Sequence, residues 1–117
     1  MGCDQLGGRV DLQGALLVVP VRGRDGAWRG LQFIAGRGLK RFLPGTAKSG
    51  GYFSIGGKPG ATLCAAEGFA TAASVHQAMG WSVAVAFDAG NLKAVGEALR
   101  AKLPAVRLVI AGDIVDH

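Results

Sequence analysis

The sequence predicts an α/β fold in which a parallel βαβαβ sheet follows a small antiparallel β-meander. In residues 15–57, short apolar runs alternate with glycine turns, as is typical of a meander. After residue 58, apolar runs alternate with helical patterns, which indicates a parallel sheet with right-handed crossovers. Each of the three later apolar runs leads to an acid, namely Glu67, Asp88 and Asp113. The fold class and this repeated acid organise the rest of the interpretation.

The N-terminal part divides into a lead and the meander. Residues 1–14 are rich in glycine and polar residues and predict a flexible lead. Residues 15–57 predict a basic antiparallel β-meander of four short strands separated by turn residues. We expect these strands at residues 15–21, 28–34, 39–43 and 52–55.

Residues 58–117 predict the α/β core. Its first helix is expected at residues 68–79, because Gly80 is a favourable residue just past a helix end. The second helix is expected to open at Asn91 as its N-cap and to stop at Pro104. A sheet of this kind normally continues beyond a third strand. We therefore expect the core to be truncated there and the chain to be a fragment of a larger protein.

Bulk composition excludes several protein classes. The chain has 117 residues and is 50% hydrophobic, which suits one domain with a real core. No apolar run approaches the roughly 20 residues that span a bilayer. The two cysteines have neither metal-ligand spacing nor the pattern of a disulfide framework. We expect a cytoplasmic protein that does not engage a membrane.

The positive charge is concentrated in the N-terminal half. Residues 1–60 carry nine basic and three acidic side chains, whereas residues 61–117 carry four basic and five acidic ones. A basic half joined to an acidic edge suits a polyanion that is held beside a metal ion. A solvated surface without a partner explains the same charges and stays open as an alternative.

The strand-end acids predict a metal site. Ligands of open parallel sheets bind outside the carboxyl ends of the strands, and Glu67, Asp88 and Asp113 would share that edge. Mg²⁺ binds carboxylates together with water and substrate phosphates. An acid on the metal would position phosphate, and an acid beside it would transfer a proton. The alternative is that these acids only solvate the rim of the sheet.

Several motifs resemble a known family. The Ala-Glu-Gly motif at residues 66–68 and the Ile-Ala-Gly-Asp motif at residues 110–113 look like those of the Toprim domain. That domain is shared by primases, topoisomerases and some nucleases. Residues 19–56 and 87–92 are similar to the primases and primase-helicases of phages, plasmids and mobile elements. The resemblance covers roughly residues 15–113.

The resemblance implies the Toprim catalytic domain of a DNA primase, which makes RNA primers on single-stranded DNA by metal-dependent nucleotidyl transfer with Mg²⁺ or Mn²⁺. Glu67 would be the catalytic acid or base and would also contact the metal. Asp113 would be the first aspartate of the Asp-x-Asp metal motif. The chain departs from this pattern because the second position is Val115, and Asp116 follows one residue later. Asp88 is a further candidate acid.

The same resemblance implies nucleic-acid contacts and partners. The backbone of single-stranded DNA would be held by Arg37, Lys40, Arg41 and Lys48. Nucleotides would be the other ligand, and a helicase or zinc-binding domain of the parent protein would be a partner. Two alternatives stay open. One is a catalytically degenerate Toprim module that binds nucleic acid or a replication partner, and the other is a Toprim nuclease.

Overall fold

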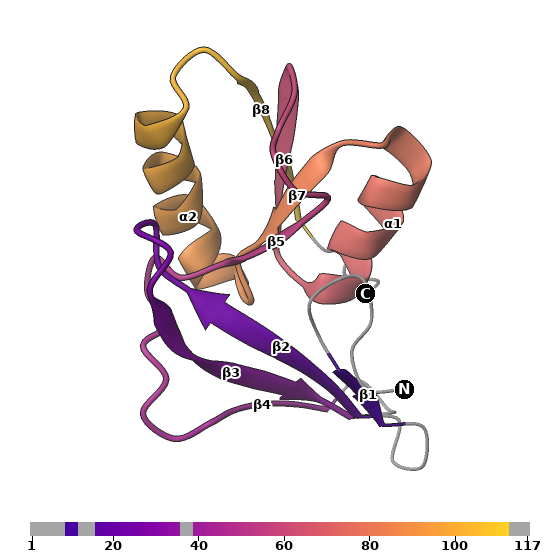
Figure 1. Cartoon of the computed structure of the whole chain (residues 1–117), viewed down its shortest axis with the longest axis vertical. Helices are drawn as coiled ribbons and strands as arrows, with labels where there is room; N and C mark the ends of the chain where they lie inside the picture. Colours follow the sequence, from indigo (N-terminus) through magenta and orange to yellow (C-terminus); the bar gives the residue numbers. More distant parts are fainter. Residues whose placement is uncertain (1–8, 12–15, 36–38, 113–117) are drawn as a thin grey trace.

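The computed structural model describes residues 9–11, 16–35 and 39–112, which form two sheets and two helices (Figure 1). The strands are β1 (Arg9–Asp11), β2 (Leu16–Arg22), β3 (Trp28–Ile34), β4 (Lys40–Phe42), β5 (Phe53–Ile55), β6 (Thr62–Ala66), β7 (Ser82–Val85) and β8 (Arg107–Ala111). The helices are α1 (Phe69–Met79) and α2 (Ala89–Lys102).

The first sheet is antiparallel and has the order β1-β2-β3-β4. Strands β2 and β3 pair over most of their length, with Val19 opposite Gln32. The register shifts after Val21, where the chain approaches the Asp-Gly turn that the sequence predicts. Strand β1 pairs with the outer edge of β2, so residues 9–11 form a strand within the segment that the sequence predicts to be a flexible lead. The unpaired backbone groups along this edge of β2 provide hydrogen-bond partners for β1, a pairing that composition alone does not predict.

The second sheet has the order β5-β7-β6-β8. Strand β6 lies in the centre and runs parallel to both β7 and β8, which confirms the predicted parallel βαβαβ core. The prediction for residues 52–55 was wrong in one respect. Strand β5 does not extend the meander but pairs antiparallel with β7, with Phe53 opposite Val85. The sequence pattern identifies a strand here but not its neighbour, because pairing is decided by tertiary packing.

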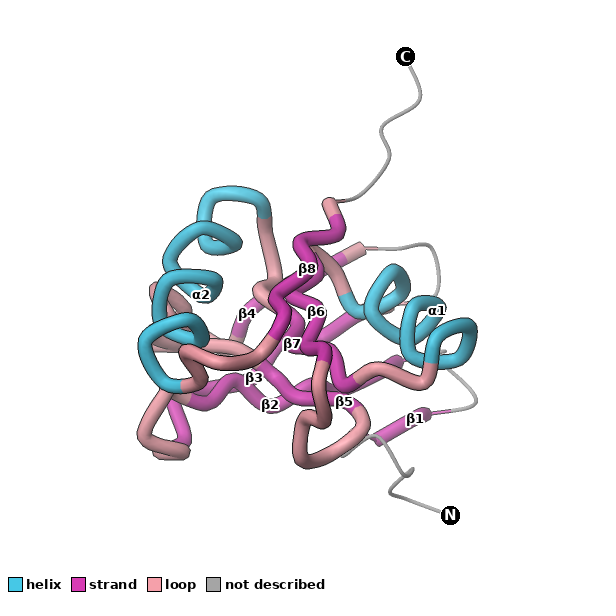
Figure 2. Tube along the Cα trace, turned by 90° about the horizontal axis from the view of Figure 1, so that it is seen from above, coloured by secondary structure: helices cyan, strands magenta, loops and turns pink. Residues whose placement is uncertain are grey.

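The two helices cover opposite faces of the second sheet, as Figure 2 shows from above. Strand β6 is apolar after its first residue, Thr62, because both faces of the strand are buried. Cys64 and Ala66 belong to the core cluster that includes α1, whereas Leu63 and Ala65 belong to the cluster that includes α2. This alternation follows the two-residue period of a strand, in which successive side chains point to opposite faces of the sheet.

The first sheet packs on the second through its β2 strand. Val19 and Val21 are fully buried and join the core cluster on the α1 side. The connection between the sheets folds back over β3, where the Thr46 hydroxyl donates to the Leu43 carbonyl at 2.6 Å. A side chain at Gly30 would collide with Thr46, so glycine permits this close approach. The connection then carries Lys48 toward the second sheet.

Both helices end as the local sequence suggests, but one begins earlier than expected. Helix α1 ends at Gly80, whose φ of 73° is the left-handed conformation that glycine favours. Helix α2 begins at Ala89 with Asp88 as its N-cap, whereas the sequence prediction placed the N-cap at Asn91. Among the described residues, no helix is long and apolar enough to cross a membrane.

Candidate functional site

The carboxyl ends of three parallel strands meet at one edge of the second sheet. Ala66, the last residue of β6, lies opposite Val85 of β7 and Ala111 of β8. The chain leaves the sheet at the same level from all three strands. This edge is where open parallel sheets bind their ligands, and it is the edge that the sequence predicts to be acidic.

Glu67 lies at this edge, immediately after β6. It is half-buried, and its backbone N–H donates to the Ala111 carbonyl at 3.2 Å. Its carboxylate reaches over the end of β8, since a Cβ on Gly112 would lie 3.8 Å from Glu67 Oε1. The next residue along the chain is Asp113. The geometry therefore directs the Glu67 carboxylate toward Gly112, at the end of β8.

Three of the predicted site residues lie outside the described residues. These are Asp113 and Asp116, predicted as metal ligands, and Arg37, predicted to contact nucleic acid. Within residues 9–11, 16–35 and 39–112, no group of three histidine, cysteine or acidic side chains is arranged to hold a metal ion. The predicted metal site stays a prediction, with Glu67 as its one described member beside the end of β8.

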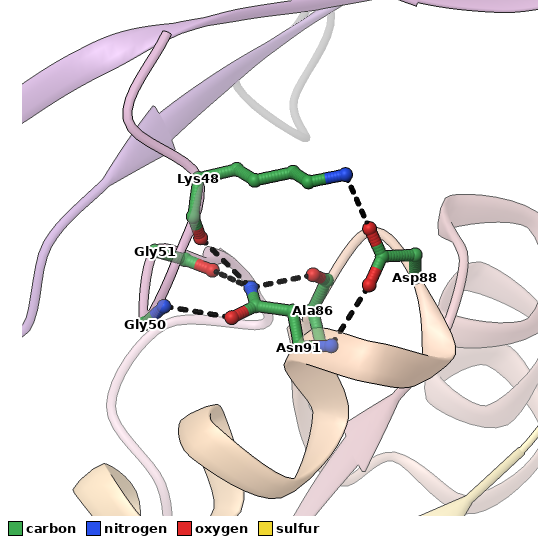
Figure 3. Close-up of polar contacts among 6 residues, drawn as sticks. All are labelled: Lys48, Gly50, Gly51, Ala86, Asp88 and Asn91. Carbon is green, nitrogen blue, oxygen red and sulfur yellow. Dashed lines mark hydrogen bonds and ion pairs between the residues drawn. The ribbon is translucent and has the colours of Figure 1, made fainter.

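Asp88 has a structural environment. Its Oδ1 accepts from the backbone N–H of Asn91 at 2.8 Å, which caps α2. Its Oδ2 lies 2.6 Å from Lys48 Nζ in an ion pair whose side chains are 38% and 44% exposed (Figure 3). The hydrogen bond from Lys48 lowers the pKa of Asp88, burial opposes this shift, and the Asn91 N–H lowers the pKa further. The carboxylate is thus held in its charged form by contacts within the protein.

Asn91 is a residue that the sequence analysis missed as part of this edge. Its buried side-chain amide joins the inter-sheet connection to the start of α2 (Figure 3). Nδ2 lies within hydrogen-bond distance of the carbonyls of Lys48, Gly51 and Ala86, at 2.8–2.9 Å. Oδ1 accepts from the backbone N–H of Gly50 at 2.7 Å. One signal in the sequence could have revealed this. Asp88 follows an apolar run directly, and aspartate is a favoured N-cap, so the helix would begin before Asn91 and include it.

The turn between β7 and α2 contains an unusual backbone conformation. Phe87 has a φ of 81°, which is rare for a large side chain. Its ring is buried and packs edge-on against Phe42 of β4, with centroids 5.7 Å apart. Such a conformation persists only where the surrounding contacts impose it. Here the packing of Phe87 between the two sheets turns the following residue, Asp88, to meet Lys48.

The predicted nucleic-acid contacts lie in different settings. Lys40 and Arg41 are exposed on the short strand β4, and no ion pair involving either occurs in the described part of the chain. Lys48 is occupied by Asp88, and its Nζ also lies 4.9 Å from the centre of the Phe42 ring. Of the aromatic residues in this half of the chain, Tyr52 and Phe53 are buried in the core, whereas Trp28 is exposed.

Comparison with known proteins identifies the family. The model of the Toprim domain matches residues 61–114, which include β6, β7 and β8. A DNA primase TraC of Escherichia coli is 41% identical over 107 residues, covering 88% of this chain and 10% of that protein. A second DNA primase TraC of Escherichia coli is 38% identical over 117 residues, covering 97% of this chain and 8% of that protein. No solved structure matches the chain at a significant level.

The chain spans about a tenth of the length of the curated relatives that it matches. Since the longer match covers 97% of the chain, the similarity includes the antiparallel sheet as well as the α/β core. The family model covers the three parallel strands of the sheet that carries Glu67, but not β5. The chain therefore belongs to the Toprim family, as a Toprim domain of the plasmid and mobile-element primase type.

Proposed function

We propose that this chain is the catalytic Toprim part of a larger cytoplasmic DNA primase that makes RNA primers on single-stranded DNA by metal-dependent nucleotidyl transfer. The observation that carries the proposal is the position of Glu67, at the carboxyl end of the central parallel strand and directed toward the end of β8. The supporting similarity is to DNA primases over nearly the whole chain.

The donor set at this edge suits a divalent cation such as Mg²⁺ or Mn²⁺. Carboxylates are the ligands that these ions prefer, and the Glu67 carboxylate lies beside the chain that continues to Asp113. We assign the metal to Asp113, Asp116 and Glu67. When bound, the ion would neutralise charge on the reacting phosphates. Glu67 would also accept or donate the proton at the attacking hydroxyl.

Asp88 has a different role in this proposal. Because its two oxygens are engaged by Lys48 and Asn91, we assign it to the support of the edge rather than to the metal. Lys40 and Arg41 have no such carboxylate partner among the described residues and are proposed to contact the DNA backbone together with Arg37. Lys48 would add to this contact where DNA competes with Asp88. A helicase or zinc-binding domain in the parent protein would be the partner of this part.

The substitution Glu67→Gln in the full-length primase tests the catalytic assignment. The amide keeps the size of the side chain but cannot act as a base, so primer synthesis should fall by at least about 100-fold, the usual contribution of general acid–base catalysis. Circular dichroism of the same variant should match the wild type. Retained primer synthesis would remove the role assigned to Glu67.

A titration with Mg²⁺ and Mn²⁺, followed residue by residue by NMR, tests the metal assignment. We expect shifts or broadening at Glu67, Asp113 and Asp116, and much smaller effects at Asp88. A response at Asp88 equal to that at Glu67 would contradict the division of roles. Absence of a localised response up to about millimolar metal, near the weak end of carboxylate sites, would contradict the metal site itself.

A second candidate function is a degenerate Toprim module that binds nucleic acid or a replication partner without turnover. Val115 at the second position of the metal motif favours it. It predicts salt-sensitive DNA binding without a specific metal response. A Toprim nuclease is the third candidate, and it differs in product. Incubation of the parent protein with metal and labelled DNA would give shortened strands for the nuclease and extended primers for the primase.

A further inference from the structure

A basic groove lies between the turn that joins β2 to β3 and the C-terminal end of α2. It consists of two adjoining hollows of about 320 and 270 Å³, which share Tyr52, Ser54 and Lys102. The first extends to Arg22 and Arg24 in the turn, and the second to Lys58 between β5 and β6. Figure 1 shows this turn beside α2. Segments distant in the sequence thus form one continuous depression.

The charge on this groove has a single sign. Arg22, Arg24, Lys58 and Lys102 line it, and no acidic side chain of the described residues does. Within the part of the chain that the structure describes, none of these four forms an ion pair, in contrast to Lys48 with Asp88. The nearby Asp25 carboxylate instead accepts from the backbone N–H of Ala27 at 3.0 Å. Four cations beside one nearby carboxylate give this groove a net positive charge, which raises the local potential and attracts an anion.

Neutral backbone groups hold two of these cations in place. Arg22 Nη1 donates to the Gly26 carbonyl at 3.1 Å, and Lys102 Nζ donates to the Arg24 carbonyl at 3.2 Å. A carbonyl orients a cation without cancelling its charge, and both side chains keep donors for a ligand. The contact of Lys102 with the turn also ties the two sides of the groove together.

The floor of the groove suits a nucleobase. The second hollow is lined by the apolar side chains of Leu63, Leu99 and Leu103 together with the ring of Tyr52. The hydroxyls of Tyr52 and Ser54 form no hydrogen bond with any described residue, so they remain available to a ligand. A largely apolar floor with one aromatic residue, beneath a rim of cations, offers a base apolar contact and the phosphates positive charge, as in proteins that bind single strands without sequence preference.

We propose that this basic groove binds single-stranded nucleic acid, with a base in the second hollow beside Tyr52, which is 8% exposed, and the backbone phosphates against Arg22, Arg24, Lys58 and Lys102. The groove lies near the start of β6, whereas Glu67 follows the end of that strand. It is therefore a surface separate from the candidate metal edge and from Lys40 and Arg41. The inference deepens the proposed function by naming where its DNA binds, and it requires no catalysis.

The test is fluorescence anisotropy of a labelled thymidine oligonucleotide of about 12 nucleotides, within the usual size of single-strand sites. EDTA is present, so that metal chemistry plays no part. The variant is Lys58→Gln/Lys102→Gln, and the matched control is Lys93→Gln/Arg107→Gln, whose two exposed cations line neither hollow. Circular dichroism confirms that each variant is folded.

The groove variant should bind about tenfold more weakly, with a salt dependence about 1.4 smaller in slope, since each single-strand phosphate contact contributes about 0.7. The control should bind within about twofold of the wild type, and Lys102→Arg should retain binding because its charge is kept. Equal losses in variant and control, or no loss in the groove variant, would overturn the proposal. So would displacement of the oligonucleotide by an equal concentration of a nucleoside triphosphate.

This outcome is independent of the primase assignment. If Glu67→Gln retains primer synthesis while the groove variant loses binding, the catalytic role is wrong and the groove stands. If Glu67→Gln abolishes synthesis and the groove variant binds normally, the groove is wrong and the catalytic role stands.

Discussion

Asp88 and Glu67 are both acids that follow parallel strands at one sheet edge, yet their surroundings differ. Asp88 caps α2 and forms an ion pair with Lys48, so its oxygens have partners on two other segments. Glu67 lies directly after the central strand, with its carboxylate over the end of β8. The comparison teaches that an acid at a strand end is not by itself a ligand of a metal. The segment that follows the strand decides its role.

Asn91, like Asp88, has a structural role at this edge. The Asn91 amide contacts three carbonyls and one N–H, drawn from the inter-sheet connection and from the end of β7. These contacts and the Lys48–Asp88 pair join the antiparallel sheet to the α/β core (Figure 3). The edge of β7 is therefore a junction between the two sheets, whereas the edge shared by β6 and β8 carries the candidate chemistry.

The largest expected effect comes from Asn91→Ala. It leaves buried backbone groups of the connection without partners, which should lower the free energy of unfolding by about 2–4 kcal/mol. Urea denaturation followed by circular dichroism measures the change. Gln77→Ala, an exposed amide on α1, is the control and should change stability by less than about 0.5 kcal/mol. A loss below about 1 kcal/mol for Asn91→Ala would show that the amide network is not the junction.

A smaller loss of stability is expected at Asp88, and two substitutions separate the contribution of the helix cap from that of the ion pair. Asp88→Ala removes both the cap and the ion pair and should cost about 1–2 kcal/mol. Asp88→Asn keeps an oxygen that accepts from the Asn91 N–H, so it should cost less than about 1 kcal/mol, the value of an exposed ion pair. Both follow from the same urea titration. Equal losses in the two variants would mean that the ion pair, and not the cap, is what Asp88 contributes.

The pH dependence of stability should report the same carboxylate. Because the pKa of Asp88 is lowered in the folded protein, its contribution is present above the unfolded pKa of about 4 and disappears as pH falls through the folded pKa. Unfolding free energies measured from neutral to acid pH should fall less steeply for Asp88→Asn than for the wild type. Lys48→Met should reduce the slope as well. Parallel curves would contradict the assignment.

The sequence predicted the elements of the fold better than their partners. The alternation of strands and helices after residue 58 identified β6, β7 and β8. Strands β6 and β7 are mostly apolar because both of their faces are buried, whereas β8 is partly exposed. The same reasoning could not place β5, because its pattern fits an edge of either sheet. Its pairing with β7 depends on the connection between the sheets, which contains turn residues and carries no periodicity.

The candidate site was predicted in part. The shared edge follows from strand order alone, so the position of Glu67 was accessible from the sequence. The role of Asp88 was not, because it depends on Lys48, forty residues earlier in the chain. The positive φ of Phe87, which turns Asp88 toward that lysine, has no sequence signature in a phenylalanine. Long-range polar contacts of this kind appear only once the chain is folded.

The smallest expected effect on stability is that of Glu67→Gln. Glu67→Gln keeps the volume of the side chain, so stability without metal should change by less than the roughly 1–2 kcal/mol expected for Asp88→Ala. A metal that binds the folded state raises the unfolding temperature by mass action. Mg²⁺ should therefore raise the midpoint of the wild type, measured by thermal denaturation, and raise that of Glu67→Gln less. If Asp88→Asn responds to Mg²⁺ as the wild type does, Asp88 contributes to stability and Glu67 to metal binding. A destabilisation by Glu67→Gln as large as that by Asp88→Ala would instead make both acids structural.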